Sequence, residues 1–200
     1  TGGLGKEIAL TFAKDGFDII LHYHNDEVGV LNLASDIRNK YKRTVRMYKA
    51  DLTKEEEITK MVENIKTDYF SLDVLVNNAA ICKDTDLMLK DKKDFLEVMN
   101  VNLIAPFLLS KQLYPLLKDA GGTIINISSN NALNSYYAES IDYDASKKAL
   151  ISMTHNLAAE FGPYINVNCV APGFIGTDNE LDGYDEEFLK EETEKIMVKR

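Results

Sequence analysis

Residues 72–80 read LDVLVNNAA, a short apolar run that ends in two asparagines and two alanines. Val74, Leu75 and Val76 are apolar on both faces of an extended chain, a pattern typical of a strand that is covered on both sides. Such strands occur in parallel sheets with helices packed on each face. The run therefore predicts the interior of an α/β sheet, with polar and small residues at its carboxyl end.

The rest of the chain alternates between strand-like and helix-like patterns. Apolar or β-branched runs bounded by turn residues predict strands at 18–23, 44–51, 72–79, 122–128 and 165–173. Apolar residues at helical spacing predict helices at 3–15, 26–41, 54–69, 91–118 and 143–161. We expect the third helix to begin with a capping box formed by Thr53 and Glu56. The alternation predicts a single α/β domain over residues 1–200, a doubly wound parallel sheet with helices on both faces.

Composition and charge exclude several functional classes. With 45% hydrophobic and 28% charged residues, the chain has the make-up of an ordinary globular protein. No apolar run approaches the roughly 20 residues of a membrane-spanning helix, and the start lacks the pattern of a secretory signal, so we expect a cytoplasmic protein. The net charge of −9 argues against nucleic-acid or membrane partners. Cys82 and Cys169 are the only cysteines, which predicts reduced thiols and no metal site.

Small or polar residues stand at several predicted strand ends. The segment TGGLG at 1–5 leads directly into a helix, where glycines let the backbone approach a pyrophosphate and free N–H groups can bind it. Asp51, residues 77–80 and the pair Ser128 and Ser129 follow later strands. Each is also compatible with a plain turn or cap. Because parallel strands share one carboxyl edge, we expect these residues, including both serine hydroxyls, to face one crevice.

Residues 143–147 read YDASK and open the last predicted helix. A spacing of four places Tyr143 and Lys147 on one helix face. A nearby cation favours the phenolate and brings the pKa of a phenol from about 10 toward neutrality, where it can exchange protons. The pair alone is also compatible with a solvated helix face.

Six segments in order along the chain resemble the short-chain dehydrogenase/reductase family. They are the glycine turn, NNAA at 77–80, NVNL at 100–103, INISS at 125–129, YDASK at 143–147 and VAPGFIGTD at 170–178. The resemblance covers essentially the whole chain. It implies a Rossmann-type fold, an NAD(P)-dependent oxidoreductase activity on alcohol or carbonyl groups, and a homotetramer packed through the long helices.

The resemblance also assigns roles to individual residues. Tyr143 handles the proton while hydride passes between cofactor and carbon, and Lys147 tunes Tyr143 and contacts the nicotinamide ribose. Ser129 holds the substrate oxygen, and Asn102 anchors a water that connects Lys147 to solvent. The expected cofactor contacts are Gly2, Gly3, Leu4, Gly5, Tyr23, His24, Asn25, Asp51, Leu52, Asn78, Ala79, Ala80, Tyr143, Lys147, Pro172, Gly173 and Ile175.

The chain departs from the family pattern in four ways. The family's glycine turn is TGxxxGxG, whereas residues 1–5 lack the three intervening positions. A strand should precede that turn, and the family continues beyond Arg200 with a helix and a final strand. We therefore expect incomplete termini, with the first and the C-terminal strand outside this sequence. Ala80 replaces a family glycine, which is a mild change because alanine is nearly as small.

The substrate is less well defined than the family. The chain resembles the 3-oxoacyl-(acyl carrier protein) reductases of fatty acid biosynthesis most in residues 81–103 and 165–178. Those reductases commonly carry arginines where this chain has GGT at 121–123 and GPYIN at 162–166, and the segment 178–194 is strongly acidic. Like charges would slow encounter with an acidic carrier. The alternatives are a dehydrogenase or reductase of a small ketone, sugar or free alcohol, and a catalytically silent regulatory protein that binds the cofactor.

The strand predicted at 18–23, which corresponds to the second strand of the family's fold, indicates which cofactor is used. Proteins of this architecture that prefer NAD place a carboxylate at that strand end to bind the adenosine ribose. Here residues 22–25 read HYHN, and the first carboxylate is Asp26. Histidine and asparagine can donate to a 2′-phosphate, and a histidine can gain a proton beside a dianion. We therefore expect NADP(H) to be preferred over NAD(H); the alternative is that these are solvated loop residues and the enzyme is indifferent.

Overall fold

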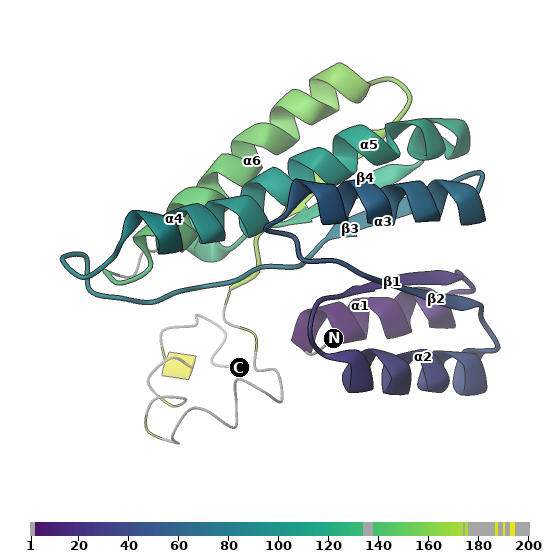
Figure 1. The fold of residues 1–200 in the computed structure, drawn as a ribbon, viewed down its shortest axis with the longest axis horizontal. Helices are drawn as coiled ribbons and strands as arrows, with labels where there is room; N and C mark the ends of the chain where they lie inside the picture. Colours follow the sequence, from purple (N-terminus) through teal and green to yellow (C-terminus); the bar gives the residue numbers. More distant parts are fainter. Residues whose placement is uncertain are drawn as a thin grey trace.

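The computed structural model describes residues 3–133, 138–173, 175, 187, 190, 193 and 194. Helices and strands alternate along the chain, as Figure 1 shows. The helices are α1 (Gly3–Lys14), α2 (Glu27–Tyr41), α3 (Glu55–Asp68), α4 (Lys92–Met99), α5 (Ala105–Ala120) and α6 (Ile141–Phe161), with a π turn η1 (Asn100–Ile104) and a 3-10 turn η2 (Asn130–Ala132). The strands are β1 (Ile19–Tyr23), β2 (Val45–Lys49), β3 (Val74–Asn77), β4 (Thr123–Ile127) and β5 (Asn166–Val170).

The predicted fold class is confirmed, and every predicted strand is present within a few residues of its expected bounds. The predicted helix at 91–118 is interrupted. Five residues of it form the π turn η1 between α4 and α5, a local widening that often occurs at functional sites. Asn102 of the NVNL motif lies in that turn and is buried.

The expected capping box at α3 is wrong. Lys54 is the N-cap residue and makes no side-chain capping bond. The hydroxyl and amide of Thr53 both donate to Asp51 Oδ1, at 2.7 and 2.9 Å. Glu57, one residue beyond the expected partner, accepts from the Asp51 amide at 2.8 Å. Asp51 offers a nearer acceptor for Thr53 than the helix does, so the polar residues here order the loop after β2.

The five strands divide into two parallel sheets within the described residues. β1 pairs with β2 in the register Ile19 with Val45, and β3, β4 and β5 pair in that order. Two clusters of buried apolar side chains accompany this division: one includes α1, α2, β1 and β2, and the other includes α3, α5, β4 and β5. In Figure 1, β1 and β2 with α1 and α2 lie on one side of the molecule, below the layer of α3, α5 and α6.

None of the described helices is long and apolar enough to cross a membrane.

Candidate active site

A cavity of about 1050 Å³ lies between the two sheets, and several of the predicted cofactor residues line it. Its walls come from β1, β3, α1, α3 and α5 and from the segments that follow β1, β2 and β3. The lining contains eight of the residues expected to contact a cofactor: Gly5, Tyr23, His24, Asp51, Leu52, Asn78, Ala79 and Ala80. The structure thus gathers residues from four separate parts of the sequence around one space.

The glycine turn packs directly against the carboxyl end of β3. A Cβ atom at Gly5 would lie 2.8 Å from Asn78 Nδ2, closer than real side chains approach one another. Gly3 begins α1 with a φ of 56°, a left-handed conformation that favours glycine. Gly2 lies outside the described residues. A helix N-terminus with free N–H groups and little side-chain bulk fits the pyrophosphate of a dinucleotide.

The end of β1 lies beside the loop after β2. His22 Nε2 is 2.9 Å from the carbonyl oxygen of Ala50, and burial lowers the pKa of His22. His24 Nε2 is 3.9 Å from Asp51 Oδ2. The hydroxyl of Thr53 is the main reason that the pKa of Asp51 is lowered, so this carboxylate is ionised at neutral pH. Lys54 Nζ lies 3.3 Å from the same carboxylate. The loop after β2 therefore carries a negative charge on Asp51, next to His24, and a positive charge on Lys54, next to Asp51.

Lys147 is almost fully buried on α6, with 2% of its surface exposed. Its Nζ donates to the carbonyl oxygen of Ile127 at 2.7 Å and lies 5.6 Å from the centre of the Tyr143 ring. Burial lowers the pKa of Lys147 to about 8. The ammonium form therefore predominates at pH 7 and is lost as the pH rises through about 8. The structure brings Tyr143 and Lys147 to one helix face, as the spacing predicts.

Ser128 and Ser129 do not share an orientation, so the expectation that both hydroxyls face the crevice is wrong for Ser128. Ser128 is buried, and its Oγ donates to the Lys147 carbonyl at 2.9 Å. Successive residues of an extended chain point to opposite sides, so only one of the two can face the site. Ser129 is half-buried and accepts from the Asn131 amide at 3.2 Å as the N-cap of η2.

Asn102 links the loop after β3 to α6. Its Oδ1 accepts from the Ile81 amide and its Nδ2 donates to the Ile81 carbonyl, both at 2.9 Å. Nδ2 also lies 3.1 Å from Ser146 Oγ, which donates to the Tyr143 carbonyl at 2.7 Å. Asn102 is thus connected to the backbone of Tyr143 through one side chain. Ser146, within YDASK, is a residue that the sequence interpretation did not single out.

The segment after β5 lies beside the one after β4. The Pro172 carbonyl accepts from the Asn130 amide at 2.7 Å, which places it next to Ser129. Gly173 and Ile175 are exposed. Eight of the predicted cofactor residues that the structure describes do not line the cavity described above: Gly3, Leu4, Asn25, Tyr143, Lys147, Pro172, Gly173 and Ile175.

A buried polar network under the site was also missed. Asn77 Nδ2 donates to Asn126 Oδ1 at 2.8 Å, and Asn126 Nδ2 donates to Thr154 Oγ1 at 2.9 Å. The three side chains tie β3 and β4 to α6 and are at most 6% exposed. Asparagines inside otherwise apolar strands were the signal, because a buried amide needs polar partners.

The described residues contain no group of three or more histidine, cysteine, aspartate or glutamate side chains arranged to bind a metal ion.

Comparison with known proteins adds the family context. A model of the short chain dehydrogenase family matches residues 1–187. The chain is 34% identical to the 3-oxoacyl-[acyl-carrier-protein] reductase FabG of Chlamydia trachomatis over 178 residues, which are 88% of this chain and 71% of that protein. Identity to the protein of the same name from Aquifex aeolicus is 36% over 180 residues, 89% of this chain and 72% of that one.

Two solved structures of similar fold superpose on the chain. The NADP active-site complex of Pseudomonas aeruginosa RhlG superposes with a TM-score of 0.90 at 26% identity, covering 100% of this chain and 79% of that one. Acetoin dehydrogenase YohF of Salmonella typhimurium superposes with a TM-score of 0.78 at 28% identity, covering 88% of this chain and 70% of that one.

Proposed function

Because the chain belongs to the short chain dehydrogenase family, we propose that this oxidoreductase uses NADPH to reduce a 3-oxoacyl group carried on an acyl carrier protein. The substrate part of the proposal is supported by relatives named as such reductases at 34% and 36% identity. The observation that carries the chemistry is the buried Lys147 ammonium 5.6 Å from the Tyr143 ring. Family membership supports a nicotinamide cofactor, and Gly5 packed against Asn78 fits its pyrophosphate.

The bound nicotinamide would supply the hydride that the carbonyl carbon accepts. Tyr143 donates its phenol proton to the carbonyl oxygen, so that C=O becomes CH–OH. Lys147 stabilises the phenolate left behind, an effect that requires its ammonium form and so weakens above about pH 8. The Ser129 hydroxyl holds the same substrate oxygen in place. Asn102 binds the Ile81 backbone and the Ser146 hydroxyl, and Ser146 in turn binds the Tyr143 carbonyl.

A second candidate is a dehydrogenase or reductase of a small ketone or alcohol. It is supported by the likeness to acetoin dehydrogenase YohF and by the absence of basic residues at 121–123 and 162–166. The structure gives another reason for the first of these absences. A Cβ atom at Gly122 would lie 2.7 Å from the Leu72 carbonyl oxygen, and Gly121 ends α5 with a φ of 62°. Both positions therefore favour glycine for packing, whatever the substrate.

A substrate panel separates the candidates. We expect the purified protein to oxidise NADPH with an acetoacetyl group on acyl carrier protein at a kcat/KM at least about tenfold above that for the free acetoacetyl thioester. The absorbance of the reduced cofactor is the readout. Equal or faster turnover of a small ketone would instead establish the second candidate. Cofactor binding without turnover of any substrate would identify the regulatory protein of the third hypothesis.

The choice of NADPH is supported by the end of β1. Residues 22–25 contain no carboxylate, and the Asp26 carboxylate accepts from the Gly29 amide at 2.8 Å as the cap of α2. The first acidic side chain after β1 is therefore already engaged as the cap of α2. His24 lines the cavity, and the exposed Asn25 follows it directly in the chain.

We expect kcat/KM with NADPH to exceed that with NADH by at least about tenfold, equivalent to roughly 1.4 kcal/mol. Replacing His24 with aspartate should reduce or reverse this preference, because a carboxylate repels the 2′-phosphate and can bind the ribose hydroxyls. The matched control is Asn39→Asp, which adds the same charge on exposed α2. Equal efficiency with both cofactors in the unmodified protein would contradict the proposal.

We also propose a homotetramer that packs through the long helices. Leu96 of α4, Ile104 of η1 and Phe107 of α5 are large apolar side chains that are 47%, 43% and 40% exposed. Ile104 and Phe107 are three residues apart and therefore neighbours on the helix surface. Burial of these side chains between copies of the chain would remove apolar surface from water.

A further inference from the structure

A buried ion pair joins the loop after β3 to the start of α6. Lys90 Nζ lies 2.9 Å from each carboxylate oxygen of Asp142. The side chains of Lys90 and Asp142 are 3% and 0% exposed. Two charges removed from water are stable only if their mutual geometry and further hydrogen bonds offset the lost solvation. This pair meets that condition, and it connects segments that are 52 residues apart in the sequence.

The further hydrogen bonds of this pair reach the backbone of the proposed acid. Asp142 Oδ1 accepts from the Tyr143 amide at 2.9 Å, and Lys90 Nζ also donates to the Lys83 carbonyl. The first N–H groups of a helix have no partner within the helix. Asp142 supplies one for Tyr143, so the carboxylate holds the residue that carries the phenol.

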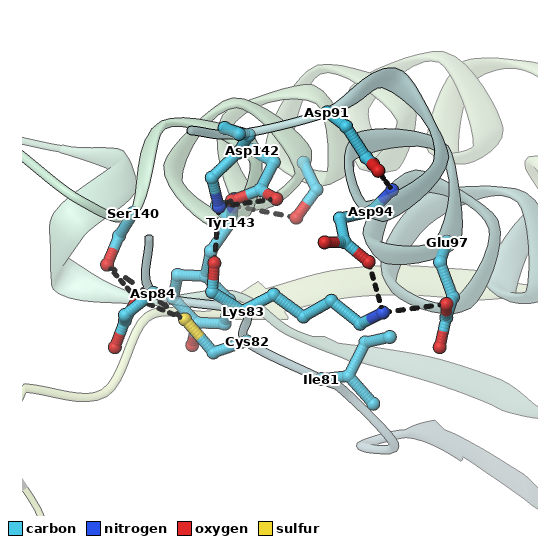
Figure 2. A network of polar contacts seen from close by, with 12 residues as sticks. Ile81, Cys82, Lys83, Asp84, Asp91, Asp94, Glu97, Ser140, Asp142 and Tyr143 are labelled. Atoms are coloured by element: carbon cyan, nitrogen blue, oxygen red, sulfur yellow. Dashed lines mark hydrogen bonds and ion pairs between the residues drawn. The ribbon is translucent and has the colours of Figure 1, made fainter. Parts of the chain in front are cut away.

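The residue at the cap of α6 is engaged elsewhere. Ser140 is the N-cap but makes no capping bond with its side chain. Its hydroxyl donates to Asp84 Oδ1 at 2.5 Å, a contact drawn in Figure 2. The Thr85 amide also donates to the Glu139 carbonyl at 3.2 Å. These bonds from the loop after β3 hold the start of α6, in place of the side-chain cap that usually stabilises a helix N-terminus.

We propose that Lys90 and Asp142 are positioning residues that fix the first turn of α6 so that the Tyr143 phenol stays over Lys147. This inference rests on the acid role of Tyr143 proposed above. Lys147 lies one turn further along and is bound to the end of β4 through Ile127. Its place does not depend on the first turn, whereas the place of Tyr143 does. Loss of the pair lets that turn fray and separates the phenol from the ammonium.

The test is the double variant Lys90→Met/Asp142→Leu. Each single change leaves a buried charge or polar group without its partner and risks unfolding, whereas the double variant removes a pair of net charge zero together with the acceptor of the Tyr143 amide and keeps similar side-chain volumes. Lys83→Met is the matched control. It removes ion pairs of 2.6 and 2.7 Å from the same loop to Asp94 and Glu97 of α4 (Figure 2) and leaves the contacts to α6 in place.

Turnover is measured per bound cofactor, so that unfolded molecules are not counted. We expect kcat of the double variant to fall at least about tenfold with the cofactor dissociation constant within about twofold, and Lys83→Met to retain kcat within about twofold. Unchanged kcat in the double variant overturns the proposal. An equal fall of kcat in Lys83→Met also overturns it, because any loss of ion pairs from the loop would then suffice.

A second readout does not depend on turnover. Ultraviolet absorbance follows phenol ionisation with pH, and subtraction of a Tyr143→Phe version of each variant isolates Tyr143. Within the part of the chain that the structure describes, Asp142, Asp144 and Lys147 are charged residues near Tyr143 on α6, and Lys90 from the loop pairs with Asp142. We expect the midpoint for Tyr143 to rise by about one pH unit in the double variant and to stay in place in Lys83→Met. No rise overturns the positioning role, whereas absence of turnover in the unmodified protein overturns only the proposed function.

Discussion

Replacing Tyr143 with phenylalanine is expected to lower turnover at least about a hundredfold and to leave cofactor binding nearly unchanged. A positioned acid or base commonly contributes a factor of about 10²–10⁴, and phenylalanine removes only the hydroxyl that exchanges the proton. Lys147 and its bond to Ile127 remain, and so do the residues that line the cavity. Steady-state kinetics with saturating NADPH measure the first effect, and fluorescence titration with the cofactor measures the second.

The control for this variant is Tyr164→Phe. Tyr164 is 52% exposed, and Lys118 Nζ lies 4.4 Å from the centre of its ring. Both residues are near the C-terminal ends of α5 and α6, whereas Tyr143 is at the start of α6. We expect it to keep kcat within about twofold. If Tyr143→Phe retained a tenth or more of the unmodified turnover, another group would have to supply the proton and the assignment of Tyr143 would be wrong.

The fold could be predicted from the sequence because its signals are local. The centre of the run DVLVN is apolar on both faces, which is typical of a strand that is covered on both sides. Turn residues and helical spacing then locate the elements between such runs. The π turn at Asn100–Ile104 has no comparable signal, since the apolar spacing continues through it. The capping box was predicted from a four-residue motif, but an acceptor just outside the motif, Asp51, took the Thr53 hydroxyl.

The candidate site was predicted through motifs, and its supports were not. Tyr143 and Lys147 are four residues apart, so helix geometry alone brings them together. Lys90 and Asp142 are 52 residues apart, and nothing in either local sequence indicates that they meet. Strand alternation turns Ser128 and Ser129 to opposite sides, but which of the two points away from the site depends on tertiary contacts, here on the Lys147 carbonyl that engages Ser128. Long-range polar contacts of this kind depend on how the elements pack, and the spacing of residues along the sequence does not indicate them.

The division of the sheet is the other feature that the strand pattern alone did not predict. Within the described residues, β1 pairs with β2 alone and β3 pairs with β4 alone. The edges of β1 and β3 that face the cavity between the sheets carry backbone groups available for further pairing. The lining is apolar where the two edges meet it, as at Ile19, Leu21, Val74 and Val76. We propose that the strand expected ahead of the glycine turn lies here and joins the two sheets into one.

A synthetic strand should therefore bind between β1 and β3 and stabilise a protein that consists of residues 1–200 alone. A peptide of about nine residues with a central run of valine and isoleucine suits a site covered on both faces. At a hundredfold excess over its dissociation constant, binding contributes about 2.7 kcal/mol. At about 2–4 °C per kcal/mol for a chain of this size, calorimetry should record a rise in Tm of about 5–10 °C. A peptide with proline at its centre lacks a ladder donor and should have little effect. An equal rise with the proline peptide would mean that general apolar adsorption, and not strand pairing, accounts for the stabilisation.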